Sequence, residues 1–256
     1  MLADVETTED AVLGGRLALR QPKRGHRFGH DAILLAAAVD ARGGEIAVDL
    51  GAGVGTAGLA LAHRVAGLEV RLIDVDPALA ALARENAARN ALADRVSVAE
   101  LDVATATPRD FAARAMLRPG EAHHVLMNPP YNDAARQNVS PDPARRQAHV
   151  AQDDTLTTWV NCASRLLTSH GTLTLIWRAT GLGDVLAALQ GFGSISVVPV
   201  HPKPRAAAIR VIVNAVKGGA TPLVLCPPLT LNDADGKPSA EAEAILRRGA
   251  ALPVEP

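Results

Sequence analysis

From residue 45 onward, apolar strand-like runs alternate with helix-like segments, and this alternation limits the folds open to the chain. The expected strands are 46–50, 69–74, 96–101, 124–127, 172–177, 195–200 and 209–215, and the expected helices are 56–65, 77–90, 108–117, 155–167 and 182–190. Such alternation is typical of a largely parallel sheet covered by helices on both faces. We therefore expect a doubly wound α/β fold, in which ligands bind beyond the carboxyl ends of the strands.

The N-terminal region precedes this alternation. We expect residues 1–10 to be frayed, residues 12–19 to form a strand and residues 31–39 to form a short apolar helix with Asp31 near its cap. A basic loop joins the last two. The predicted organisation is a small strand/helix extension that packs on the ligand site, followed by one domain with a C-terminal appendage, with the boundary between residues 1–44 and 45–256.

Composition excludes several classes of protein. A chain of 256 residues with 48% hydrophobic residues can bury one such domain, and its formal charge of −1 gives no global basic field. Local basic clusters lie at residues 16–27, 145–146, 203–210 and 247–248, and most clusters of this kind are solvated surface. Cys162 and Cys226 lack metal-ligand spacing and are typical of a reducing compartment. The chain begins without an apolar signal-peptide core and no apolar run reaches the length of a membrane span. We expect a soluble cytoplasmic protein without metal or membrane attachment; its oligomeric state stays open.

A glycine-rich turn follows the first expected strand of the alternation. It runs from Asp49 through Gly51, Gly53 and Gly55, and glycines there allow a tight turn and close approach of a ligand to the backbone. Residues 53–58 also match the dinucleotide fingerprint G-x-G-x-x-G, which is a weak signal alone. A carboxylate at Asp49 suits a cationic, amine-bearing ligand and repels a pyrophosphate. The turn therefore favours a cofactor of the S-adenosylmethionine type over NAD.

Two further acids end neighbouring expected strands. Asp74 is placed to accept hydrogen bonds from both hydroxyls of a ribose, and Asp102 from the amino group of an adenine. For both residues the alternative is a helix-cap or turn role without a ligand. Asp76, directly before Pro77, is expected to be a helix cap.

The fourth expected strand ends in the tetrapeptide Asn128-Pro129-Pro130-Tyr131. The Asn128 side-chain oxygen and the Pro129 carbonyl can accept the hydrogens of a planar amine, which aims its lone pair at an electrophile. The prolines stiffen the loop, and Tyr131 offers a ring on which a base can stack. The alternative is a proline-stiffened turn after a buried strand.

With these motifs in place, the chain resembles the class I S-adenosylmethionine-dependent methyltransferases of the Asn-Pro-Pro-Tyr type, which act on exocyclic amines of bases or on a glutamine amide. Within them it is most similar to the bacterial tRNA methyltransferases that modify adenine 37 of valine tRNA at N6. The resemblance rests on residues 21–31 with the following AILLAAA, on DLGAGVG and NPPY, and on the tail PPLTLNDADGKPSAEAEAILRRG.

The resemblance implies a Rossmann-like sheet of seven strands whose last strand is antiparallel, a role that residues 209–215 fit. It implies S-adenosylmethionine as the cofactor, S-adenosylhomocysteine as the product and tRNA as the substrate. It also suggests that Arg27, Phe28 and Asp31 lie over the methionine end of the cofactor, the alternative being a structural loop and helix cap. The chain departs from the family at Lys237-Pro238, where an aromatic and a hydroxyl residue are expected.

The expected reaction is the transfer of a methyl group to the N6 amine of an adenine in the anticodon-loop region of tRNA. The main rival is a protein glutamine N5-methyltransferase that acts on release factors, although that family carries an N-terminal helical domain not seen in this sequence. A DNA adenine methyltransferase and a non-catalytic S-adenosylmethionine-binding protein are two further interpretations of the same motifs. We expect residues 132–152 to form a loop that closes over the base or contacts phosphate, the alternative being a solvated, disordered lid.

Overall fold

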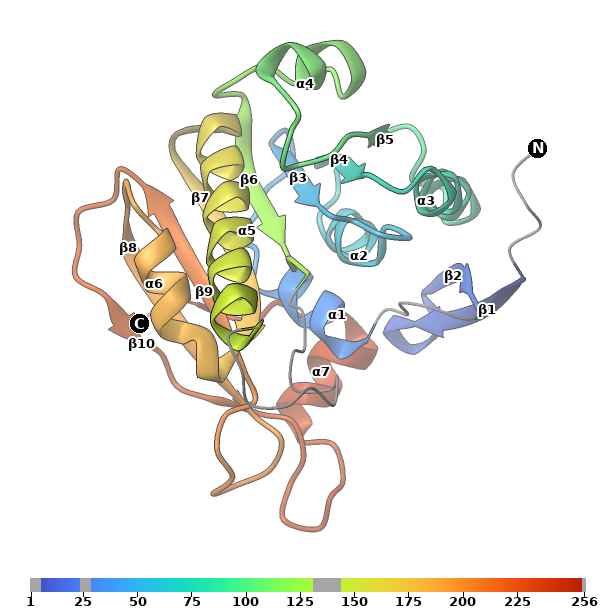
Figure 1. The fold of residues 1–256 in the computed structure, drawn as a ribbon. Helices are drawn as coiled ribbons and strands as arrows, with labels where there is room; N and C mark the ends of the chain where they lie inside the picture. The colour runs from blue at the N-terminus through green and yellow to red at the C-terminus, as the bar shows by residue number, and fades with distance from the viewer. Residues whose placement is uncertain (1–5, 24–28, 131–143, 255–256) are drawn as a thin grey trace.

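A mixed β-sheet with helices on both faces forms the centre of the molecule (Figure 1). The computed structural model describes residues 6–23, 29–130 and 144–254, with side chains in the last range from residue 155 onward. The strands of the sheet are β3 (Ile46–Leu50), β4 (Glu69–Asp74), β5 (Val96–Glu100), β6 (Ala122–Met127), β7 (Leu167–Arg178), β8 (Phe192–His201), β9 (Arg210–Lys217), β10 (Val224–Leu225) and β11 (Leu229–Thr230).

The strand order is β10-β8-β9-β7-β6-β3-β4-β5, with β11 also paired to β8. Neighbouring strands from β7 through β6, β3 and β4 to β5 run parallel, and β9 is antiparallel to both β7 and β8. The expected doubly wound fold with an antiparallel strand at 209–215 is confirmed. Beyond the seven expected strands, the two-residue strands β10 and β11 pair parallel with β8 and extend the sheet to nine strands.

Helices cover the two faces of this sheet and enclose two apolar cores. Side chains of α1, α2 and α3 belong to the core on one face, where α7 packs outside α1, and side chains of α4, α5 and α6 belong to the core on the other face. The helices are α1 (His30–Ala37), α2 (Thr56–Arg64), α3 (Pro77–Arg89), α4 (Pro108–Arg114), α5 (Ala144–Leu166), α6 (Leu182–Ala188) and α7 (Ala240–Arg248), with short 3-10 turns η1 (Leu13–Gly15) and η2 (Ala179–Gly181).

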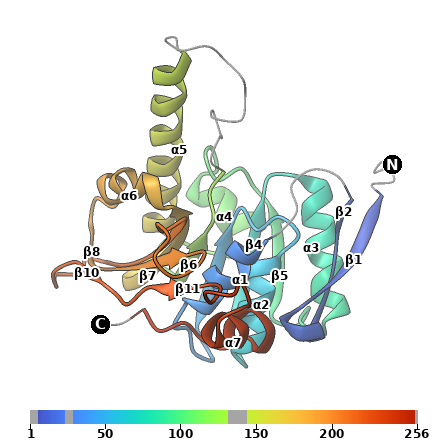
Figure 2. The same cartoon turned by 90° about the horizontal axis from the view of Figure 1, so that it is seen from below.

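The N-terminal region corrects two expectations. In place of one strand at 12–19, an antiparallel hairpin of β1 (Thr7–Val12) and β2 (Leu17–Pro22) turns at Gly14, whose φ of 66° is left-handed. The second correction concerns residues 1–10, for which the sequence predicts frayed structure. In the structure β1 begins at Thr7, because each of its residues pairs with a residue of β2. Figure 2 shows the hairpin beside α3, where the Asn86 side-chain amide donates to the Arg20 carbonyl at 3.0 Å. The division at residue 44 stays a prediction.

Two helices differ from their expected limits. The helix α5 has 23 residues and begins at Ala144, so the part of the expected loop 132–152 from 144 onward is helical, whereas 132–143 lies outside the described residues. The helix α1 begins after Gly29, whose backbone is extended, and no side chain caps it. Asp31 lies near the cap as expected, in the first turn of α1, but its carboxylate pairs with a residue of β9 and does not cap the helix.

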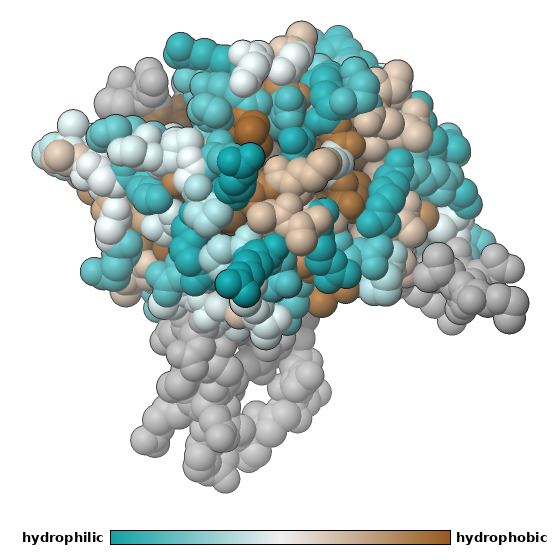
Figure 3. Space-filling view, turned by 90° about the horizontal axis from the view of Figure 1, so that it is seen from above, coloured by the Kyte–Doolittle hydropathy of each residue, from teal (hydrophilic) through white to brown (hydrophobic). Residues whose placement is uncertain are grey.

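Along the described part of the chain, no helix is both long and apolar enough to cross a membrane. The face seen from above Figure 1 mixes hydrophilic and hydrophobic side chains (Figure 3).

Candidate functional site

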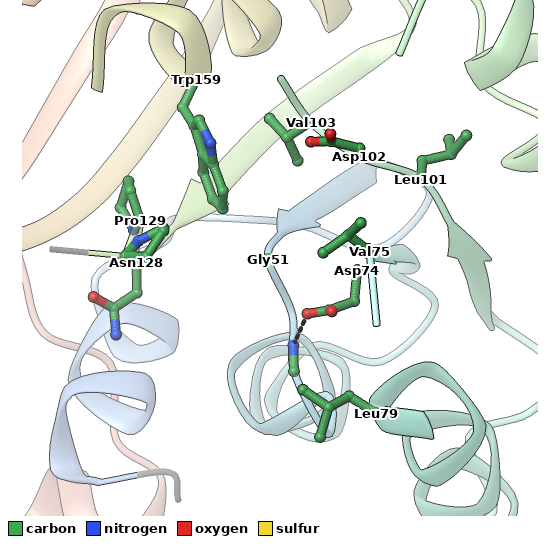
Figure 4. A pocket seen from close by; sticks show the side chains of 12 residues that line it. Gly51, Asp74, Val75, Leu79, Leu101, Asp102, Val103, Asn128, Pro129 and Trp159 are labelled. Atoms are coloured by element: carbon green, nitrogen blue, oxygen red, sulfur yellow. Dashed lines mark hydrogen bonds between the residues drawn. The ribbon is translucent and has the colours of Figure 1, made fainter. Parts of the chain in front are cut away.

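Two adjoining cavities lie at the carboxyl ends of the parallel strands. The first, of about 420 Å³, follows the ends of β3, β4, β5 and β6, and its wall is drawn in Figure 4. The second, of about 430 Å³, lies between the glycine turn, α1 and the start of β9. They share Gly51, Gly53, Leu79 and Asn128. The strand ends that the sequence singled out thus converge on one elongated site with two compartments.

The glycine turn forms the floor shared by both compartments. Gly51 has a φ of 70°, and a Cβ built on it would lie 2.5 Å from Cη2 of Trp159, so only glycine fits this conformation and this contact. Gly55 caps α2 with a left-handed φ of 88°. Gly53 has no atom within 4 Å of a built Cβ and leaves the backbone open toward the cavities, whereas Gly51 makes room for the Trp159 indole. Gly55 serves the start of the helix and lines neither cavity.

Asp49 lies beneath the second compartment. Its side chain is 3% exposed and accepts a hydrogen bond from the Gly58 amide at 2.8 Å. Burial, helped by the nearby charge of Asp74, raises the pKa of Asp49 to about 7. The carboxyl group therefore titrates near neutral pH, and a cationic ligand in this compartment would favour its ionised form.

Asp74 and Asp102 line the first compartment as expected, and both also stabilise turns. The Asp74 carboxylate accepts from the Gly53 amide at 2.6 Å (the dashed line in Figure 4) and from the Asp76 amide at 2.9 Å. Asp102 accepts from the Ala104 amide at 2.9 Å. A carboxylate has about four lone-pair sites, so these bonds leave acceptor capacity for ligand hydroxyls or an amino group. The expected cap role of Asp76 is confirmed.

Apolar side chains that the sequence analysis did not single out form the walls of the first compartment. They are Val75, Leu79, Leu101 and Val103. Val75 is 65% exposed although it is a large hydrophobic residue. An exposed apolar side chain beside a cavity is suited to cover the face of a flat ring. The sequence does contain a signal for these two residues. Val75 directly follows Asp74 and Val103 directly follows Asp102, so each valine comes just after an acid that lines the cavity.

Asn128 and Pro129 stand at the end of β6, where the two compartments meet. The Asn128 side-chain oxygen is buried and has no hydrogen-bond partner among the described residues. An unpaired buried acceptor costs free energy, about 1 to 3 kcal/mol, and such atoms are rare in folded proteins. Pro129 is buried and Pro130 exposed beside it. Tyr131 lies outside the described residues.

The second compartment is bounded by the start of α1. The Asp31 carboxylate accepts from the Arg210 guanidinium at 2.8 Å, and both residues line the cavity. Thr56, the first residue of α2, is 3% exposed, and its hydroxyl has no partner among the described residues. It was missed because it resembles an ordinary helix-start residue in sequence. Arg27 and Phe28 lie outside the described residues.

Trp159 of α5 is a further wall residue that the sequence did not reveal. Its indole lies against Gly51 and reaches the first compartment between Pro129 and Val103 (Figure 4). The expected helix contained Trp159, but nothing in the local sequence shows which way its ring points.

Comparisons with known proteins agree with this geometry. Residues 27–199 match the family described as methyltransferase small domain. A tRNA1(Val) (adenine(37)-N6)-methyltransferase of Porphyromonas gingivalis is 31% identical over 163 residues, 62% of this chain and 61% of that protein. The enzyme of the same name from Dickeya chrysanthemi is 26% identical, with 86% of each chain covered. In the Porphyromonas case the match therefore spans about three fifths of the relative's length.

Among solved structures, a predicted O-methyltransferase from Agrobacterium tumefaciens superposes with a TM-score of 0.72 and 29% identity, covering 87% of this chain and 98% of that one. The expected resemblance to class I methyltransferases is confirmed by the family match, the relatives and the strand order together. The chain belongs to the methyltransferase small domain family.

Proposed function

We propose that the protein transfers a methyl group from S-adenosylmethionine to the exocyclic N6 amine of an adenine in tRNA. The observation that carries this proposal is the buried, unpartnered side-chain oxygen of Asn128 at the junction of the two compartments. An amine hydrogen is the partner that such an acceptor lacks.

The lining of the site fits S-adenosylmethionine. In the first compartment, Asp74 and Asp102 match the ribose hydroxyls and the adenine amino group, while Val75 and Val103 match the two faces of the adenine ring. In the second compartment, Asp49 matches the amino group and the Thr56 hydroxyl, at the N-terminus of α2, matches the carboxylate of the methionine part. When bound, the cofactor supplies a methyl group on a positively charged sulfur.

Asn128 and Pro129 perform the positioning step. Their oxygens accept the two hydrogens of the adenine amine, which directs the nitrogen lone pair toward the methyl carbon. As the nitrogen–carbon bond forms, the carbon–sulfur bond breaks and its electron pair leaves with S-adenosylhomocysteine. The nitrogen then loses one proton to water, so the step requires no lysine or histidine base. Catalysis comes from positioning and from acceptors arranged for the developing positive charge. Stacking of the base on Tyr131 stays a prediction.

The choice of tRNA rests on the names of the relatives from Porphyromonas gingivalis and Dickeya chrysanthemi. A base in an RNA loop is also less costly to turn out of its stack than a base in a duplex. Adenine 37 of a valine tRNA is therefore the first position to examine.

A labelled-methyl assay tests the proposal. The protein is incubated with methyl-labelled S-adenosylmethionine and either unmodified bulk tRNA or a release factor, and the digested products are identified by mass spectrometry. The expected product is labelled N6-methyladenosine from tRNA. Label on a glutamine amide would show that the substrate is a protein and not tRNA, with the role of Asn128 unchanged. Label on a ribose or other hydroxyl would overturn the amine-holding mechanism.

A further inference from the structure

Two loops project from the rim of the second compartment. Loop 202–209 joins β8 to β9, and loop 231–239 joins β11 to α7; both extend from the carboxyl-end side of the sheet (Figure 1). Ile209, Arg210 and Leu231, at the bases of these loops, line the same cavity as Asn128. A substrate that places a group at Asn128, beside the methionine part of the cofactor, therefore lies next to the bases of both loops.

Backbone hydrogen bonds join the two loops into one unit. The Leu231 amide donates to the His201 carbonyl at 2.8 Å. Asn232 donates twice to the Pro202 carbonyl, from its backbone amide at 3.2 Å and from its side-chain amide at 2.9 Å. The loops thus keep a fixed position relative to each other, and we call them together the basic loop pair.

Each loop is also stabilised internally. In the first, the His201 ring nitrogen Nδ1 lies 2.6 Å from the Ala206 carbonyl, and the Ala206 amide donates to the Lys203 carbonyl. In the second, Asp233 accepts from the Lys237 amide at 3.0 Å. A binding surface whose backbone is fixed in advance loses less conformational entropy when it binds.

The basic loop pair has a net positive charge, whereas the whole molecule does not. The two loops, residues 202–209 and 231–239, contain three Lys or Arg residues and two Asp residues, a net charge of +1, whereas the whole chain has a formal charge of −1. Lys203, Arg205 and Lys237 are exposed and form no ion pair with a described residue. Asp233 uses its carboxylate inside the loop, so Asp235 is the acid that opposes them. Positive charges without internal partners are available to an anionic ligand.

The geometry points to a function for the basic loop pair: Lys203, Arg205 and Lys237 bind the phosphate backbone of the substrate RNA on either side of the nucleotide held at Asn128. This inference rests on the proposed function. Lysine and arginine contacts to phosphates fix the register of a nucleic acid and carry no sequence information, so they suit a site that recognises the base by its contacts at Asn128. A polyanion also explains why these three side chains are unpaired, while Arg210 at the cavity wall is paired with Asp31.

Salt-dependent binding tests the inference without relying on methylation. The dissociation constant of unmodified bulk tRNA is measured by filter binding between 50 and 300 mM KCl for the wild type and for the variant K203A/R205A/K237A. Each lost phosphate contact lowers the salt slope by about 0.7 to 0.9. The triple variant is therefore expected to reduce the slope by about 2 to 3 and to weaken binding at low salt at least about tenfold.

Three matched variants separate position from charge. R42A/R114A/R118A removes three exposed arginines near the opposite, amino-terminal edge of the sheet and is expected to leave the slope unchanged. K203R/R205K/K237R keeps the charges and is expected to retain binding. D235N removes the opposing acid and is expected to strengthen binding. An unchanged affinity for S-adenosylmethionine in every variant shows that the site is intact.

The outcomes distinguish the two proposals. If the wild type methylates tRNA and the triple variant keeps the wild-type slope, the basic loop pair is not the RNA surface, although the proposed function stands. If K203A/R205A/K237A and R42A/R114A/R118A reduce the salt slope by the same amount, the effect comes from global charge and the inference is wrong. If the wild type methylates a protein and binds no tRNA, the proposed function fails and the RNA surface fails with it.

Discussion

The carboxyl edge of the sheet has two halves with opposite chemistry. The half formed by β3, β4 and β5 contains Asp49, Asp74 and Asp102, and backbone amides already bond to all three carboxyl groups. The half next to β8 and β9 contains the basic loop pair, whose Lys203 and Arg205 have no ion partner among the described residues. Backbone amides fix the carboxyl groups of the first half and leave acceptor capacity for a ligand, whereas the lysine and arginine of the other half are exposed and unpaired in the described part of the chain.

Asn128 lies between these halves and combines their properties. Its side chain is positioned by a buried strand, as in the first half, but its oxygen is unpartnered, as in the second. The acidic half is therefore suited to hold one small ligand in a fixed place, and the basic half to bind a large anionic one. Changes in the two halves should therefore affect different steps.

The largest effect is expected at the boundary. Replacing Asn128 with alanine removes the acceptor that orients the amine, and loss of one such preorganised group typically lowers kcat by about 100- to 1,000-fold. The dissociation constants of S-adenosylmethionine and tRNA should change little. Single-turnover methyl transfer and two separate binding measurements check this result.

Asn128→Asp is the matched variant, because a carboxylate of nearly the same volume keeps an acceptor oxygen at this position and replaces the amide NH2 with a second oxygen. It should retain more activity than Asn128→Ala. Wild-type turnover in the alanine variant would show that Asn128 does not hold the amine.

The next largest effect is expected in the acidic half. Asp74→Ala removes a charged acceptor, and hydrogen bonds to charged groups contribute about 1.5 to 3 kcal/mol, so the cofactor dissociation constant should rise by about 10- to 100-fold. Isothermal titration with S-adenosylhomocysteine measures this change, and tRNA affinity should be unaffected.

Asp76→Ala provides the control for this change. It removes the cap of α3, where the Asp76 carboxylate accepts from the Ala78 amide, but Asp76 does not line the cavity. This variant should lose about 1 kcal/mol of stability without a change in cofactor affinity. Equal losses of affinity in both variants would mean that Asp74 acts through the structure of the turn.

The sequence predicts the acidic half better than the basic half, for a physical reason. Each strand–turn–helix unit is specified locally: Asp49 and the glycines mark one turn, and Asp76-Pro77 marks the start of α3. The parallel order of the strands then brings the acids to one edge without further information. The seven strands expected from the alternation are accordingly confirmed. The antiparallel direction of β9, which the family resemblance implied, is also confirmed.

Features that depend on contacts between distant segments could not be predicted in this way. The pairing of Asp31 with Arg210 joins α1 to β9 across 179 residues and overrides the local capping preference of an acid. The contact of Trp159 with Gly51 and the joining of loops 202–209 and 231–239 also require the assembled fold. The early start of β1 depends on its pairing with β2, since no local signal marks residue 7 as ordered.

A smaller, pH-dependent effect is expected at Asp49. Burial raises its pKa to about 7, so between the ordinary range of an aspartate and pH 7 the folded state holds a proton that the unfolded state has lost. Stability from this group therefore falls as pH rises through that window and is lowest above pH 7. Asp49→Asn removes this decline, which thermal unfolding at pH 5 and pH 8 measures.

Cofactor affinity should show the opposite dependence at the same residue. If the ionised carboxylate binds the amino group of the cofactor, wild-type affinity rises by up to about tenfold between pH 6 and pH 8, following the ionised fraction. Asp49→Asn should bind with little dependence on pH. A rise of equal size in the variant would assign the titration to another group.

The smallest effect is expected at Trp159, whose ring lies on Gly51 and beside Pro129 and forms part of the wall of the first compartment. Trp159→Phe keeps an aromatic ring but loses part of the wall, and aromatic contacts contribute about 0.5 to 1.5 kcal/mol, so a cofactor affinity about threefold weaker is expected. Because Trp159 lines the cavity and Trp177 is only 2% exposed in the core, cofactor binding should alter the fluorescence of Trp159. The fluorescence change should persist in Trp177→Phe and vanish in Trp159→Phe. A fluorescence change on cofactor binding that survives in Trp159→Phe would place the ligand away from this wall. If tRNA also altered the fluorescence of Trp159, its binding in the basic half would be sensed at the wall of the first compartment.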